Sequence, residues 1–148
     1  MSTKLTNSDA QRIMHDIMSL DKPSQNILFY WIKAYSPSFA SGDKRIGKWL
    51  IWVNRQDIDR VWIIIKEATE NGTLGIASKV STAKPNVHSS NLKRHVICIY
   101  TYDYKNKENI NKVRQSLRKM GFLAKIPYKT DSATLAGRYG FNSSLYYE

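Results

Sequence analysis

The sequence has few of the residues that define several common classes of protein. It holds one cysteine, Cys98, among 148 residues, which excludes a disulfide framework and a cysteine-based metal site. No apolar run approaches the ~20 residues that span a membrane, and the first residues lack the apolar segment of a secretion signal. We therefore expect a protein of the cytoplasm with no membrane partner.

The common catalytic motifs are missing as well. The seven glycines form neither a dinucleotide-binding nor a P-loop pattern, and the sequence contains no HExxH, CxxC or GxSxG motif. Of the three histidines, His95 begins an apolar stretch, where we expect a structural role. The sequence thus predicts no metal and no cofactor, and any chemistry would depend on isolated side chains.

Acidic residues are scarce relative to basic ones. Lys and Arg number 23 against 12 Asp and Glu, which gives a net charge of +11. Such an excess attracts phosphate groups and other anions. We expect a nucleotide, RNA or a phosphorylated peptide as partner; the alternative is that the charge only keeps the surface solvated.

Length and composition indicate one domain, residues 1–148, with its own core. Two N-terminal helices are predicted within residues 1–36. Asn7 or Ser8 can cap the first, which carries Ile13, Met14, Ile17 and Met18 on one face. The second contains Ile27, Leu28, Trp31 and Ile32 and ends near residues 36–37.

The body, residues 47–140, contains two strand–helix–strand units. Strands are predicted at 48–53, 76–82, 94–101 and 122–128, and helices at 56–71 and 107–120. Short connections between these elements favour a curved, mostly antiparallel sheet with both helices on one face. The predicted fold class is α+β.

Strand alternation sorts the side chains onto two faces. The face toward the helices would carry Trp49, Ile51, Val53, Val80, Ile97, Ile99, Ala124 and Ile126. The other face would carry Lys48, Leu50, Trp52, Lys79, Ser81, Cys98, Tyr100 and Lys125. Lysines beside aromatic rings suit a stacked base and a neutralised phosphate. The alternative is that the N-terminal helices cover this face and make Trp52 part of the core.

The predicted ligand-binding residues supply charge or a stacking surface. They are Lys48, Trp52, Lys79, Arg94, Tyr100, Lys129 and Arg138. Lys79 has a second possible role, because a partly desolvated amine near other cations has a lowered pKa and can act as a base. While it stays charged, the same lysine pairs with phosphate.

Several stretches resemble the basophilic leukaemia-expressed protein family. They include KVST at 79–82, HVICIYT at 95–101, KVRQSLRKMGF at 112–122 and YKTDSATLAGRYG at 128–140. The resemblance implies a fold similar to translation initiation factor 4E, a curved sheet backed by helices on its convex side. In that fold tryptophans hold the ligand, and Trp49, Trp52 and Trp62 are candidates by chemistry alone.

The resemblance also implies an enzymatic alternative, since bacterial members of the family are labelled as phosphothreonine lyases. Lys48 and Trp49 match the first two positions of a Lys-aromatic-His strand in such enzymes, and Lys79 falls where the base would lie. Leu50 replaces the acid histidine. We favour binding of a nucleotide or RNA over this lyase, and over a basic module that binds an acidic protein.

Overall fold

The computed structural model describes residues 4–40, 45–86, 93–131 and 144–148. In chain order their elements are α1 (Asn7–Ser19), β1 (Trp31–Tyr35), β2 (Gly47–Asn54), α2 (Arg55–Glu70), β3 (Ala77–Ser81), β4 (Arg94–Thr101), α3 (Lys107–Lys119), β5 (Pro127–Thr130) and β6 (Tyr146–Tyr147). The two predicted helices of the body and its first three predicted strands are confirmed to within about two residues at each end.

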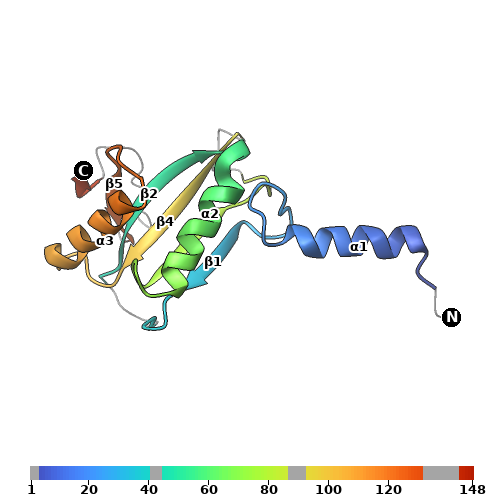
Figure 1. Ribbon diagram of the computed structural model, residues 1–148, viewed down its shortest axis with the longest axis horizontal. Coiled ribbons are helices and arrows are strands. Elements are labelled where there is room, and N and C mark those ends of the chain that lie inside the picture. Colours follow the sequence, from blue (N-terminus) through green and yellow to red (C-terminus); the bar gives the residue numbers. More distant parts are fainter. Residues whose placement is uncertain (1–3, 41–44, 87–92, 132–143) are drawn as a thin grey trace.

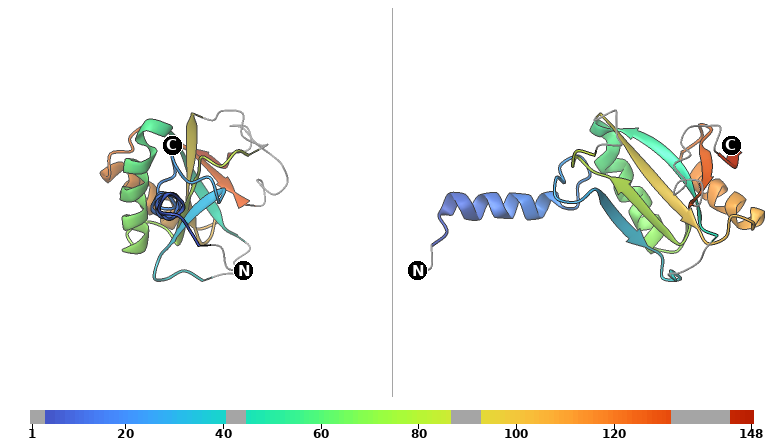
Figure 2. Two further views of the ribbon diagram at one scale, coloured as in Figure 1. Left: turned by 90° about the vertical axis from the view of Figure 1, so that its right-hand side faces the viewer. Right: turned by 180° about the vertical axis from the view of Figure 1, so that it is seen from behind.

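The strands form one six-stranded sheet in the order β1-β3-β4-β2-β5-β6, and every neighbouring pair is antiparallel. Helices α2 and α3 lie on the same side of this curved sheet (Figures 1 and 2). The predicted α+β architecture, with its helices on one face, is therefore confirmed. The opposite side of the sheet is free of both helices, and we call it the open face.

The core lies between the sheet and the two helices. Alternate residues of the central strands enter it, as the predicted alternation requires: Trp49, Ile51, Val80, Ile97 and Ile99. The helices contribute residues at helical spacing: Ile58, Val61, Trp62, Ile65, Ile110, Val113 and Leu117. The Trp49 indole Nε1 donates a hydrogen bond to the Ile110 carbonyl at 3.1 Å, which ties β2 to α3.

A buried arginine shapes the chain after α3. The Arg114 guanidinium is 0% exposed and donates to the carbonyls of Phe122, Ala124 and Glu148 at 2.8, 2.7 and 2.9 Å. The bonds to Phe122 and Ala124 hold residues 122–124 away from a strand path, and the predicted strand at 122–128 is wrong in its first part. The strand is β5, Pro127–Thr130, and Ala124 and Lys125 are exposed.

The predicted second N-terminal helix is also wrong, because residues 31–35 form strand β1. The Asn26 side chain accepts hydrogen bonds from the backbone N–H groups of Leu28 and Phe29, a turn that competes with a helix. After the turn, apolar Ile32 and Ala34 alternate with neighbouring residues that face the other way. The spacing of the apolar residues fits both the helical period of 3.6 residues and the strand period of two, and pairing with β3 selects the strand.

Helix α1 extends away from the rest of the chain (Figure 1). Thr6, rather than Asn7 or Ser8, caps it through a reciprocal pair of hydrogen bonds with Asp9. The alternative in which two N-terminal helices cover the open face is therefore wrong. No helix in the described parts of the chain has the length and apolar character to cross a bilayer.

Candidate ligand-binding face

Cross-strand register brings four lysines together on the open face. In one row across the sheet, Lys48 on β2 lies directly opposite Lys129 on β5. In the next row, Lys33 on β1 lies directly opposite Lys79 on β3. We call Lys33, Lys48, Lys79 and Lys129 the lysine cluster. Like charges in directly opposed positions destabilise a sheet, so the cluster needs an explanation beyond folding.

In the described part of the chain, the Asp131 carboxylate partly offsets this charge. Asp131, just after β5, accepts from the Lys48 ammonium at 3.0 Å. Lys48 and Lys129 are only 6% and 7% exposed, which makes their opposition costly because water cannot screen it fully. Among the described residues, no carboxylate lies within ion-pair distance of the Lys79 ammonium. Lys79, which is half-buried between Lys33 and the apolar floor, is thus open to an anion.

Aromatic rings hold the charged ends in place. The Lys79 Nζ atom lies 3.9 Å from the centre of the Trp31 ring and 5.8 Å from that of Tyr100. The Lys48 Nζ atom lies 5.6 Å from the same Tyr100 ring. Cation–π contact stabilises an ammonium without using its N–H donors. The Tyr100 ring therefore has two ammonium groups near it, and the Lys79 donors remain available.

The cluster changes the acidity of its members. Burial lowers the pKa of Lys79, and the charges of Lys48 and Lys33 lower it further, against opposing effects of Cys98 and Asp131. Burial also lowers the pKa of Lys129, with a further contribution from Lys48. An anion bound among these groups would favour their protonated forms.

The floor between the lysines is apolar. Leu50 and Cys98 are opposed across β2 and β4, and Cys98 is opposed to Lys79 across β4 and β3. Both floor residues are buried. Burial raises the pKa of the Cys98 thiol to about 11, so this group stays protonated near neutral pH. The thiol is thus a packing group rather than a nucleophile.

An aromatic side chain continues the open face beyond this floor. Trp52 follows Leu50 along the same face of β2, is paired with Val96, and is 41% exposed. Arg94 is exposed one row farther, opposite Asn54. The open face therefore runs from charged groups at Lys48 to an accessible indole and a second cation.

The structure groups most of the predicted ligand-binding residues. Lys48, Lys79, Tyr100 and Lys129 lie in two adjacent rows, with Trp52 and Arg94 farther along the same face. Arg138 lies outside the described residues. Two tryptophan candidates for stacking are wrong, because Trp49 and Trp62 are fully buried in the core.

Sequence reasoning missed three residues of the site: Trp31, Lys33 and Asp131. The first two were assigned to a helix, although the alternation in Trp31–Tyr35 carries a strand signal. Asp131 had no motif around it, and its role follows only from the position of β5 beside β2.

His95 lies on the helix side of the sheet and makes structural contacts. Its Nδ1 lies 2.7 Å from the Ser81 carbonyl oxygen, and its Nε2 accepts a hydrogen bond from Arg55 Nε at 3.1 Å. The first contact is a hydrogen bond from a protonated Nδ1, since a carbonyl can only accept. Burial lowers the pKa of His95, so its ring is neutral near pH 7.

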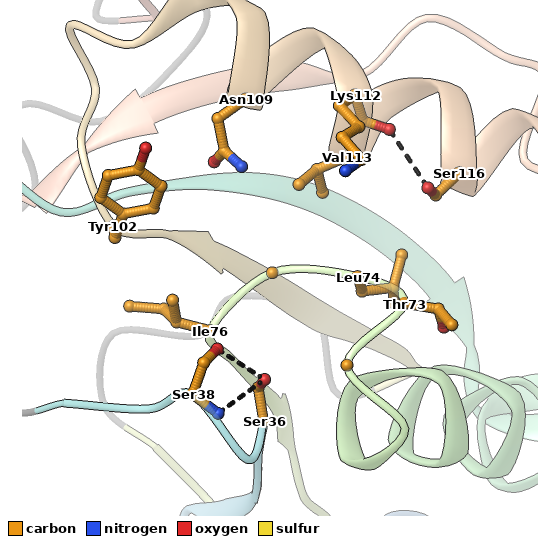
Figure 3. Close-up of a pocket in the computed structure, with 12 residues that line it drawn as sticks. Ser36, Ser38, Thr73, Leu74, Ile76, Tyr102, Asn109, Lys112, Val113 and Ser116 are labelled. Carbon is orange, nitrogen blue, oxygen red and sulfur yellow. Dashed lines mark hydrogen bonds between the residues drawn. The ribbon is translucent and has the colours of Figure 1, made fainter.

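A cavity of about 480 Å³ lies on the helix side, between α3 and the segment that leads into β3 (Figure 3). Six of its twelve lining residues carry a hydroxyl or side-chain amide group, and Lys112 is its one charged side chain. None of the predicted ligand-binding residues that the structure describes lines it. With one lysine and one aromatic ring, Lys112 and Tyr102, the cavity has less charge than the lysine cluster of the open face.

Comparison with known proteins agrees with this architecture. A family model described as basophilic leukemia-expressed protein Bles03 matches residues 40–136. The complex of C. elegans eIF4E-3 with the 4E-binding protein Mextli and cap analog is 16% identical, with a TM-score of 0.56 over 92% of this chain and 80% of that chain. The complex of Ascaris suum eIF4E-3 with m7G cap is 13% identical, with a TM-score of 0.52 over 88% of this chain and 76% of that chain. The predicted similarity to the initiation factor 4E fold is confirmed.

Proposed function

We propose that this chain, which belongs to the basophilic leukemia-expressed protein Bles03 family, binds a nucleotide or RNA on its open face. The observation that carries the proposal is the pair of directly opposed lysines in each of two adjacent rows. Direct opposition of like charges opposes folding, whereas a phosphate placed between the rows would relieve the repulsion. Structures of the same fold in complex with m7G cap support a nucleotide as the ligand class.

The proposed pose follows from the order of side chains along β2. Phosphate oxygens lie at Lys48 and Lys79, and the base stacks on Trp52 or Tyr100. Trp52 lies four positions after Lys48, which is about 13 Å along a strand. A nucleotide that carries several phosphates can bridge this distance. The intervening floor of Leu50 and Cys98 suits the less polar middle of such a ligand.

Tryptophan fluorescence provides the test, with GTP, 7-methyl-GTP and a short 5′-phosphorylated RNA titrated at increasing KCl concentration. We expect affinity to fall with salt, with a logarithmic slope of about −0.7 for each phosphate of the single strand that the protein neutralises. Lys48→Met should weaken binding and flatten the slope. Lys79→Arg should retain most of the affinity, because guanidinium remains charged and pairs with phosphate.

The matched control is Lys112→Met, which removes the same charge from the helix side of the sheet. This variant should bind as the wild type does. An equal loss in both methionine variants would show non-specific attraction by net charge. Absence of binding to all three ligands at low salt would contradict the proposed function.

The lowered pKa of Lys79 supports a second candidate, β-elimination of phosphate from phosphothreonine. A neutral amine would remove the proton on the α-carbon, a carbon–carbon double bond would form, and phosphate would leave from the β-carbon. Lys79 and Leu50, the position of the missing acid, lie in one row on either side of Cys98. No proton donor occupies the Leu50 position, so we favour binding.

Mass spectrometry of a phosphothreonine peptide separates the two functions. The binding proposal predicts that the peptide mass stays unchanged after incubation with the wild-type protein. A product lighter by one phosphoric acid, formed by wild type but not by Lys79→Arg, would establish a lyase. Arginine serves as the diagnostic variant because it keeps the charge and cannot act as the base.

A further inference from the structure

The segment that precedes β1, residues 4–30, differs from the rest of the chain in charge. We call it the arm. It contains three basic and three acidic residues: Lys4, Arg12, Lys22, Asp9, Asp16 and Asp21. Its formal net charge is therefore zero, and the whole excess of +11 lies elsewhere in the chain. The arm is thus separate in its electrostatics from the surface that we propose for ligand binding.

The arm also exposes large apolar side chains. Ile13, Met14, Ile17 and Met18 form one stripe along α1 and are between 43% and 70% exposed. Helix α1 projects from the body (Figures 1 and 2). A lone helix of 13 residues is marginally stable in water. At the base of the arm Ile27, Leu28 and Phe29 are exposed as well. This surface has the properties of an unpaired interface.

The charge of the arm distinguishes between possible partners. Helices that bind anionic lipid carry Lys and Arg on their polar face, and nucleic-acid binding likewise requires a basic surface. The neutral arm meets neither requirement. A second copy of the arm does fit, because it is equally apolar and adds no net charge to the interface.

We propose that two copies of this chain dimerise by antiparallel pairing of their α1 helices. The helix is about 20 Å long at 1.5 Å per residue. Antiparallel pairing therefore places the two strongly basic bodies at opposite ends, beyond the Debye length of about 8 Å at physiological salt. A parallel pair would place the bodies side by side, where they would repel each other.

Residue sizes along the stripe suit this arrangement. A pair centred on Met14 sets Ala10 of each copy level with Met18 of the other, so a small residue faces a large one.

Light scattering of the full chain at high micromolar concentration tests the proposal. The expected mass is twice that of the 17.1 kDa chain. Met14→Glu, which places a charge in the stripe, should weaken dimerisation at least tenfold. Ser8→Glu, which adds the same charge on the exposed polar side of the same helix, should leave it unchanged. A wild-type mass of one chain would overturn the proposal, and co-sedimentation of that monomer with phosphatidylcholine vesicles would assign the arm to lipid.

Disulfide trapping tests the direction of pairing without depending on the Glu variant. Oxidation of a mixture of Ala10→Cys and Met18→Cys chains should yield mainly the disulfide that joins one chain of each variant. In the antiparallel pair, the thiols of two Ala10→Cys chains would lie about 12 Å apart along the helix axis, too far for a bond. The native Cys98 is buried and should not compete. A predominance of disulfides between two chains of the same variant would show parallel pairing and overturn the antiparallel arrangement.

Discussion

The two sides of the sheet bury cations in different ways. On the helix side, three fixed backbone carbonyls accept hydrogen bonds from the Arg114 guanidinium. On the open face, the Lys79 ammonium lies over the rings of Trp31 and Tyr100 and has no described carboxylate partner. The first cation has its donors used by the protein itself, and the second keeps them free. This difference separates a structural charge from one suited to an external anion.

Among the substitutions that test this difference, replacement of Arg114 should change the free energy of unfolding most. Arg114→Met leaves three buried carbonyls without their donor, and we expect the free energy of unfolding to fall by about 3 kcal/mol or more. Arg114→Lys should recover only part of this loss, because an ammonium lacks the planar fork of a guanidinium. Urea denaturation measures both variants.

Arg60→Met provides the control for this prediction. Arg60 is on the surface of α2 and makes a 3.5 Å ion pair with Asp57. An exposed pair of this kind contributes little, so the change should be within about 0.5 kcal/mol. Similar losses in Arg60→Met and Arg114→Met would contradict the structural role assigned to the buried guanidinium.

His95 should have the next largest effect, which is on the stability of the protein at acid pH. Its pKa is lowered in the folded state, mainly by burial, so between that pKa and about 6.5 the unfolded chain binds more protons. Stability therefore falls as pH decreases through this window, by at most about 1.4 kcal/mol per pH unit. His95→Gln should remove this dependence. Identical pH profiles for the two proteins would contradict the assignment.

Much of the fold could be predicted because local signals and tertiary pairing agree there. The apolar positions of α2 fit only the helical period, and the alternation in β2 and β4 fits only the strand period. The two faces of the central strands could therefore be assigned from the sequence. The elements that were predicted wrongly depend on hydrogen bonds that hydrophobic periodicity does not reveal. Arg114 determines the path of residues 122–126, and the Asn26 turn together with β3 makes residues 31–35 a strand.

The candidate site was only partly predictable for the same reason. The lysines of β2 and β3 were identifiable because strand alternation places them on the open face. Their opposition to Lys129 and Lys33 depends on the register between strands, which alternation within one strand does not specify. The opposed lysine pairs that indicate a ligand therefore could not be predicted from the sequence.

The smallest expected effect on the free energy of unfolding concerns Lys79. Here removal of the side chain's charge should stabilise the protein. Burial and the charges of Lys48 and Lys33 lower its pKa in the folded state. Between that lowered pKa and about 10.4 the unfolded chain binds more protons, so stability rises with pH through this window. Below the window the lysine is charged in both states, and the folded protein bears the full cost.

Lys79→Met should therefore stabilise the free protein at pH 7 by up to about 1 kcal/mol, since it removes one member of an opposed lysine pair. This advantage should shrink as pH rises through the window toward about 10.4, because the wild-type amine then loses its charge. Urea denaturation at pH 7 and near pH 10.5 measures the change. Lys48→Met is the matched control, because it removes the partner of Asp131 and should not stabilise. If Lys79→Met destabilises the free protein at pH 7, the ring contacts outweigh the repulsion, and Lys79 resembles Arg114 rather than contrasting with it.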